Sequence, residues 1–182
     1  MSTSLIFDIK KYAINNPKLF VDYGNHLACP RNPKIFEQPH LLICETGINI
    51  VATIDIDQFY IMSSLYCGIL INQQYSLEYI LALMNSSLFN FLMFKINLEN
   101  TGGAFTKAKI YHYKQLPIKS ISIDKQKSFI DLVDKILKIT KFSDYSENLN
   151  KQTKVQKYGK QIDQMVYKLY NLTPEEIKIV EN

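Results

Sequence analysis

The sequence predicts an α+β fold, in which an antiparallel or mixed sheet with a packed helix is followed by a helical C-terminal tail. Between residues 40 and 71, three runs are rich in β-branched and aromatic residues, which favour strands. From Ser76 onward, apolar residues recur at spacings of 3 and 4, the period of amphipathic helices. Strands that precede most of the helices in this way are typical of α+β domains.

The composition is that of a globular protein with a sizeable core: 182 residues, 47% hydrophobic and 21% charged. This length predicts one main domain, residues 1–122, and a helical tail, residues 123–182, that packs on the domain or on partner domains. The net charge of +4 permits nucleic-acid binding without requiring it. The three cysteines are widely spaced and form no C-x-x-C pair, which indicates reduced thiols: Cys29, Cys44 and Cys67.

The N-terminal half predicts strands after an irregular start. Prolines and a glycine interrupt residues 1–38, so we expect a short helix or strand followed by an irregular, mostly extended segment. The runs HLLICET, INIVATID and FYIMSSLYCGILI are then separated by turn signals at Thr46-Gly47 and at residues 55–58. This pattern predicts an antiparallel meander of three strands.

The C-terminal half predicts helices. Ser76 is a suitable N-cap for a single helix over residues 77–92, whose wide apolar stripe would pack against the sheet. Asp124 is expected to cap a second helix, which packs on a third helix whose stripe covers residues 155–172. The pattern TPEE, which begins at Thr173, is a capping box with proline at the first helical position, and it predicts a last short helix.

No constellation of residues for catalysis is found in the sequence. It contains neither G-x-S-x-G, nor a phosphate-binding loop, nor the Asn-Pro-Pro-aromatic motif of amino-methyltransferases. The three histidines have unrelated spacings and no adjacent carboxylate or cysteine cluster: His26, His40 and His112. We therefore expect no enzyme activity, cofactor or metal in this chain alone. Without a signal peptide or a sufficiently apolar span, we expect a cytoplasmic protein that does not contact the membrane.

The stretch ENTGGAFTKAKIYHYKQLPIKS, residues 99–120, is the candidate binding segment. A Gly-Gly turn precedes a basic, aromatic, strand-like run, which fits either an edge hairpin or a nucleic-acid contact. The lysines would neutralise phosphates: Lys107, Lys109 and Lys114. Four side chains would read base edges if the strand faces a groove: Thr101, Thr106, His112 and Gln115. Tyr111 and Tyr113 alternate with His112, so one of these two sets is expected to face the core.

A resemblance to a known family covers nearly the whole chain from Tyr23. The segment YGNHLACPRNPKIFEQPHLLICETG resembles the start of the C-terminal specificity domain of TaqI-like adenine DNA methyltransferases and their fused restriction-modification enzymes. Four further segments are similar and follow in the same order: IVATIDIDQFYIMSSLY, YSLEYILALMNSSLFNFLMF, TGGAFTKAKIYHYKQLPI and IDQMVYKLYNLTPEEIKIVE. One departure is that His40 and Cys44 stand where the family often has a basic residue, so a DNA contact there is expected to be lost.

The resemblance implies a target recognition domain that binds double-stranded DNA and reads a short sequence. Methyltransferase and nuclease domains or subunits, which use S-adenosylmethionine and Mg²⁺, would perform the chemistry, and this chain would be a fragment or a free-standing specificity module. Together with the basic run, the resemblance gives these expected DNA-contacting residues: Arg31, Lys34, Thr101, Gly102, Gly103, Thr106, Lys107, Lys109, His112 and Lys114. The alternative is a specificity subunit or protein-interaction module whose helical tail binds partner subunits.

Overall fold

The computed structural model describes residues 2–6, 9–14, 19–27, 29–47, 49–61, 64–101 and 108–182. Strands occupy the N-terminal part of the chain and helices the C-terminal part, which confirms the predicted α+β class.

The N-terminal segment forms more regular structure than its prolines predict. β1 (Ser2–Ile6) is the central strand of a small sheet, antiparallel to β4 (Leu19–Asp22) and parallel to β7 (Tyr60–Ile61). β2 (Ile9–Lys10) and β3 (Ala13–Ile14) form a separate antiparallel pair. The part that remains irregular contains one 3₁₀ turn, η1 (Pro33–Ile35), whose N-cap Asn32 accepts a hydrogen bond from the Lys34 N–H (3.0 Å).

The central sheet has the strand order β6-β5-β8, so the predicted meander is wrong. Its members are β5 (His40–Cys44), β6 (Ala52–Asp55) and β8 (Leu65–Gly68), and both neighbours run antiparallel to β5. The outer edge of β6 is already occupied: the Tyr12 N–H donates to the Ala52 carbonyl (3.0 Å), and the Asn85 amide accepts from the Ala52 N–H (3.0 Å). The third strand therefore pairs with the open edge of β5.

The predicted single helix after Ser76 is two helices, α1 (Leu77–Asn85) and α2 (Ser87–Thr101), with a bend of 64° between them. Ser76 caps α1 as predicted, because its hydroxyl accepts from the Tyr79 N–H (3.0 Å). The helix breaks at Ser86, which has an extended backbone (φ −67°, ψ 156°) and whose hydroxyl accepts from the Phe89 N–H (3.3 Å). Ser86 thus ends one helix and begins the next.

The strand predicted after the Gly-Gly pair is also wrong over residues 110–113, within the part of this run that the structure describes. Residues 110–113 form a short helix, α3 (Ile110–Tyr113), and α2 extends as far as Thr101. In a helix, neighbouring side chains point about 100° apart instead of alternating between two faces, so the period-2 interpretation of this run does not hold.

Three helices complete the chain: α4 (Ile123–Thr140), α5 (Leu149–Tyr170) and α6 (Pro174–Glu181). The N-cap of α4 is Ser122 rather than Asp124, which lies in the first turn. α4 packs against both α1 and α5, which confirms the predicted helix pair. The capping box of α6 is present, since the Thr173 hydroxyl accepts from the Glu176 N–H (3.3 Å) and the Glu176 carboxylate accepts from the Thr173 N–H (2.7 Å).

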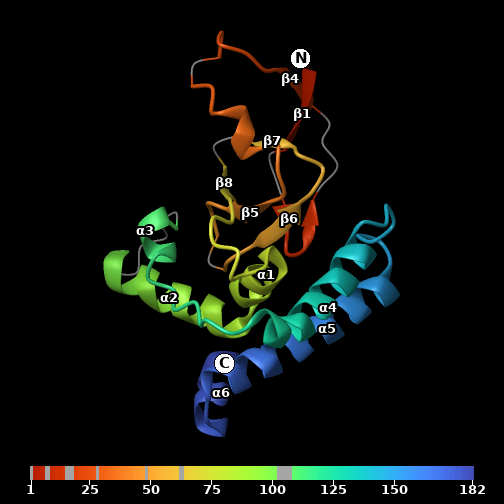
Figure 1. Cartoon of the computed structure of the whole chain (residues 1–182). Coiled ribbons are helices and arrows are strands. Elements are labelled where there is room, and N and C mark those ends of the chain that lie inside the picture. The colour runs from red at the N-terminus through yellow and green to blue at the C-terminus, as the bar shows by residue number, and fades with distance from the viewer. Residues whose placement is uncertain are drawn as a thin grey trace.

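Figure 1 shows how these elements are arranged. The sheets stand above α1, α2 and α3 lie to one side, and the α4–α5 hairpin extends to the other. One apolar core joins the sheet to the helices, and its fully buried members include Tyr79, Phe89, Val133, Ile162 and Val166. The helical tail is therefore part of the same packed body as the sheet.

Within the described ranges, no single helix is long and apolar enough to cross a bilayer. Only the bent pair α1–α2, taken together, has the length and composition of a membrane span.

Candidate nucleic-acid interface

α3 is held in place by contacts at its N-terminal end. The buried residue Ala108 donates its N–H to the Glu45 carbonyl (3.1 Å), just after β5. The next N–H, that of Lys109, donates to Nδ1 of His112 (3.3 Å). Half-buried Tyr113 contacts the sheet, with its ring against Tyr66 of β8 (centroids 6.1 Å apart). The short helix is therefore fixed against the β5–β8 side of the sheet.

His112 is an anchoring residue, which corrects the expectation that its side chain probes bases. Only 1% of its surface is exposed. Its Nδ1 accepts the Lys109 N–H, so in the neutral ring the proton is on Nε2. Burial, and secondarily the positive charge of Lys109, lower the pKa of His112, which favours this neutral form. A ring enclosed in this way cannot reach a base edge.

The outer surface of α3 is basic and apolar at once. Lys109 and Lys114 are exposed, as the DNA-binding hypothesis requires. Between them, Ile110 and Tyr111 are 57% and 47% exposed. Sequence reasoning missed this apolar pair as candidate contacts, because the assumed strand gave no reason to place both side chains outside. A helical period across residues 109–114 was the signal that would have found them.

Arg31 and Lys34 lie at a second exposed basic position, on and before η1. The Tyr23 hydroxyl donates to the Arg31 carbonyl, and Phe36 packs against Tyr60 (ring centroids 4.7 Å apart). These contacts leave both cationic side chains directed away from the core.

β8 connects the two basic positions. Its Cys67 thiol lies 4.0 Å from the Ile35 carbonyl at the end of η1, while the neighbouring Tyr66 contacts Tyr113 of α3. Because successive side chains of a strand point to opposite faces, η1 and α3 lie on the two sides of this edge strand. The structure thus brings Arg31, Lys34, Lys109 and Lys114 to one edge of the central sheet.

Some expected contacts lie outside the described residues: Gly102, Gly103, Thr106 and Lys107. Thr101 is the last residue of α2, and its side chain is likewise not described. What the structure defines are the two ends of this segment, α2 on one side and the buried Ala108 on the other.

A cluster of polar side chains at the α1–α2 bend sets the direction of α2, and we call it the polar joint: Asn85, Ser86, Ser87, Asn90 and Asp163. The Asn85 amide accepts from the Ala52 N–H (3.0 Å) and donates to the Ala52 carbonyl (2.9 Å), as a neighbouring strand would. The Asn90 amide accepts from the Ile50 N–H (2.7 Å) and donates to the Ser86 carbonyl (2.7 Å). α1 is thereby bonded to β6, and α2 to the segment just before β6.

The joint reaches α5 through Asp163. Its carboxylate accepts from the Ser87 N–H (2.7 Å) and the Ser87 hydroxyl (3.0 Å), so it binds the first N–H group of α2, near the positive end of the helix dipole. Burial raises the pKa of Asp163, while the Ser87 bonds and the nearby Lys11 oppose that rise. Lys11 itself donates to the Asn85 carbonyl (3.0 Å), and burial lowers its pKa.

His40, the departure from the family pattern, is fully buried. Its Nε2 lies 3.4 Å from Asp55 Oδ2, and its Nδ1 lies 2.8 Å from the Gln38 carbonyl. The Asp55 carboxylate also accepts from the N–H groups of Asp57 (2.8 Å) and Phe59 (2.7 Å), which shapes the turn after β6. Burial raises the pKa of Asp55. His40 and Asp55 are paired residues of β5 and β6, and their complete burial leaves them no access to DNA.

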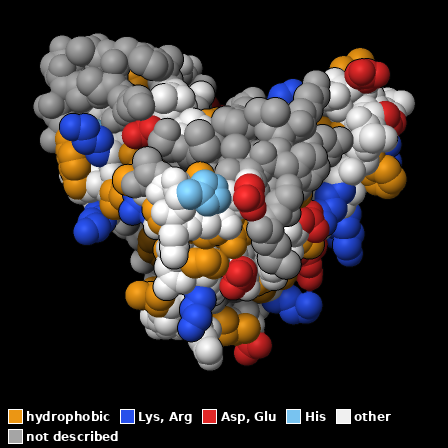
Figure 2. All heavy atoms as spheres, turned by 90° about the horizontal axis from the view of Figure 1, so that it is seen from above, with side chains coloured by type: hydrophobic (Ala, Val, Ile, Leu, Met, Phe, Trp, Pro, Cys, Tyr) orange, Lys and Arg blue, Asp and Glu red, His pale blue; other side chains and the backbone are white. Residues whose placement is uncertain are grey.

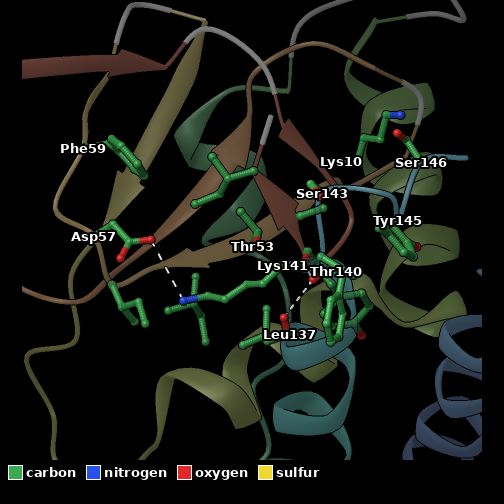
Figure 3. Close-up of a pocket in the computed structure, with 16 residues that line it drawn as sticks. Lys10, Thr53, Asp57, Phe59, Leu137, Thr140, Lys141, Ser143, Tyr145 and Ser146 are labelled. Atoms are coloured by element: carbon green, nitrogen blue, oxygen red, sulfur yellow. Dashed lines mark hydrogen bonds and ion pairs between the residues drawn. The ribbon is translucent and has the colours of Figure 1, made fainter. Parts of the chain in front are cut away.

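A cavity of about 350 Å³ lies at the opposite, β6 side of the sheet, between β2–β3 and the tip of the α4–α5 hairpin (Figure 3). Lys141 approaches Asp57 across it (4.0 Å), and the Thr140 hydroxyl donates to the Tyr12 carbonyl (2.5 Å). The cavity is thus separated from the basic edge by the width of the sheet. No group of three or more His, Cys, Asp or Glu that could hold a metal ion occurs among the described residues.

Figure 2 shows the distribution of charge seen from above. Lysine and arginine side chains lie toward the rim of the visible face, whereas acidic side chains also lie near its middle. On this face, the described basic residues therefore form local groups rather than one continuous basic surface.

Residues 7–118 match the TaqI-like C-terminal specificity domain. The chain belongs to this family. Membership confirms the resemblance seen in the sequence, and it gives this TaqI-like specificity domain a DNA-recognition role in a methyltransferase-type enzyme. No relative was found among curated proteins. The family match spans both basic positions, α3 and η1.

Proposed function

We propose that this specificity domain reads a short duplex sequence through the β8 edge of its sheet, and directs an adenine methyltransferase and an endonuclease to that site. The observation that carries the proposal is the surface of α3, where Lys109 and Lys114 flank the exposed Ile110 and Tyr111 while buried His112 anchors the helix. Lysines contribute affinity through phosphates, and apolar side chains contact bases and thymine methyl groups.

In this proposal the chain performs no chemistry of its own. S-adenosylmethionine and Mg²⁺ belong to methyltransferase and nuclease domains or subunits of the restriction-modification system, which this module positions on DNA in the cytoplasm. Two groups with shifted pKa values support this division of roles, because both make structural hydrogen bonds: Asp163 of the polar joint and the neighbouring Lys11.

The alternative, a protein-interaction module, requires the helical tail to present an apolar face to its partners. The apolar stripes of α4 and α5 are instead buried within the chain, including Val133, Ile136, Ile162 and Val166. Because other parts of the chain already cover both apolar stripes, DNA recognition is favoured over partner binding as the primary role.

The test is a fluorescence-anisotropy titration of the chain with duplex DNA at several salt concentrations. If Lys109 and Lys114 each meet a phosphate, their double replacement by alanine flattens the slope of log K against log salt by about 1.8, at roughly 0.9 per contact. The matched control replaces Lys125 and Lys138, two exposed lysines of α4, and leaves the slope unchanged. Equal effects of both pairs would contradict the assignment of α3 to the interface.

A further inference from the structure

We propose that the exposed face of α5 is a second contact surface for the sugar-phosphate backbone of DNA, centred on Lys154, Lys157 and Lys160. This inference rests on the proposed function and extends it, because it places part of the affinity on the helical tail, outside the edge strand β8. It is carried by the charge pattern of α5 and by the partners of the carboxylates around it.

The outward-facing residues of α5 include lysines and no carboxylate. Lys154, Lys157 and Lys160 recur every three residues and are all exposed. Their exposed neighbours on the helix are neutral hydrogen-bonding residues: Asn150, Thr153, Gln156, Gln161 and Gln164. Several of these side chains, together with Lys157 and Lys160, line a shallow surface depression. The apolar part of its lining comes from Leu132 and Met165.

Two of the carboxylates near this face in sequence are engaged, whereas Glu147, just before α5, is exposed. Asp163, the only acidic residue of α5, points inward and binds Ser87. Asp144, just before α5, pairs with Lys151. The salt bridges found among the described residues include none of Lys154, Lys157 and Lys160.

α4 provides an internal comparison, because it belongs to the same hairpin and is also partly exposed. Its outer face mixes both signs of charge, and Lys127 forms an i,i+4 pair with Asp131 (3.5 Å). Such mixing is what a face that meets only water usually shows. On α5, like charges three residues apart repel one another, which disfavours the helix unless an anionic partner is bound.

Nucleic acid fits this face better than an acidic protein surface. The centres of protein–protein interfaces are enriched in aromatic and other large apolar side chains, whereas protein–DNA interfaces are polar and positively charged. Among the described residues, no large hydrophobic side chain between 150 and 168 is highly exposed; the only one on α5 is Leu149 at its first turn. Lysine, glutamine and threonine are all suitable donors to phosphate oxygens.

The position of α5 indicates which part of the DNA it meets. α4 and α5 extend on the β6 side of the molecule, whereas α3 and η1 flank β8 at the other edge of the sheet (Figure 1). The α5 face therefore contacts backbone outside the base pairs read at α3, and its contribution is independent of sequence.

The experiment measures the salt dependence of binding to a 40-base-pair duplex by fluorescence anisotropy. Replacement of Lys154, Lys157 and Lys160 by alanine is expected to flatten the slope of log K against log salt by between about 2 and 2.7, at roughly 0.9 per phosphate contact. The same three positions changed to arginine should restore the slope. The ratio of affinities for different duplex sequences should stay as in the unaltered chain.

The control variant carries Lys125→Ala, Lys127→Ala and Lys138→Ala on α4, which remove the same charge from the mixed face. An equal flattening by the α4 and α5 triple variants, or no flattening by the α5 variant, would overturn the inference. No flattening would instead point to an acidic protein partner. If the unaltered chain binds no duplex, the proposed function fails as well; if it binds through α3 alone, only this inference fails.

Discussion

Replacing Asn85 by alanine should strongly destabilise the fold, because this side chain substitutes for a neighbouring strand along β6. It makes two hydrogen bonds with Ala52, at 3.0 and 2.9 Å, and it is buried. Loss of the two bonds costs about 1 kcal/mol each, and the buried Ala52 N–H left without a partner adds about 1–2 kcal/mol. The Ala52 carbonyl keeps its bond from the Tyr12 N–H. The total loss is about 3–4 kcal/mol.

The measurement is urea unfolding followed by circular dichroism. With a denaturant dependence of about 2 kcal/mol per molar urea, the midpoint should fall by about 1.5–2 M. Asn150→Ala, at an exposed position of α5, is the matched control and should shift the midpoint by less than about 0.3 M. If the two variants unfold at the same urea concentration, the amide of Asn85 does not hold β6 to α1, and the account of the strand order is refuted.

Three further outcomes are expected. Ile162→Asp places a charge at a 1% exposed position and should destabilise by several kcal/mol in thermal melting, whereas the half-buried Met165→Asp should cost clearly less. The raised pKa of Asp163 means that the folded state binds the proton of this carboxyl more tightly than the unfolded state does. The free energy of unfolding therefore falls as pH rises above about 4. Urea titrations at several pH values should show that Asp163→Asn removes the part of this fall that Asp163 causes. Tyr111→Ala should change the ratio of affinities between DNA sequences by about 1–3 kcal/mol while leaving the salt slope unaltered, as competition anisotropy will show.

Features fixed by neighbouring residues were predictable from the sequence. The cap at Ser76, the capping box from Thr173 and the α4–α5 pair depend on side chains within a few positions, and all three were found. The bend at Ser86 was not predictable in this way. It depends on Asp163, which binds Ser87 from 76 positions away.

The same reason explains the errors at the candidate site. The exposure of Lys109 and Lys114 agrees with the sequence-based hypothesis. The burial of His112 does not, because it follows from the attachment of Ala108 to Glu45 and of Tyr113 to Tyr66, contacts between distant parts of the chain. A run such as IYHYK fits a strand or a helix equally well by local preference, and the tertiary contacts decide between them.

The polar joint also sets how accurately the far end of α2, which packs beside α3, is placed. α2 has 15 residues, so its far end lies about 22 Å from the bend at 1.5 Å per residue. A hydrogen bond to a base edge tolerates a spread of about 0.5 Å in distance. Over an arm of that length, this tolerance corresponds to an angular play of only about 1.3° at its base. Side-chain bonds to Ala52, Ile50 and Asp163 hold that base from two sides. A slightly loosened joint would let the far end of α2 shift beside α3, and the interface would then distinguish DNA sequences less sharply.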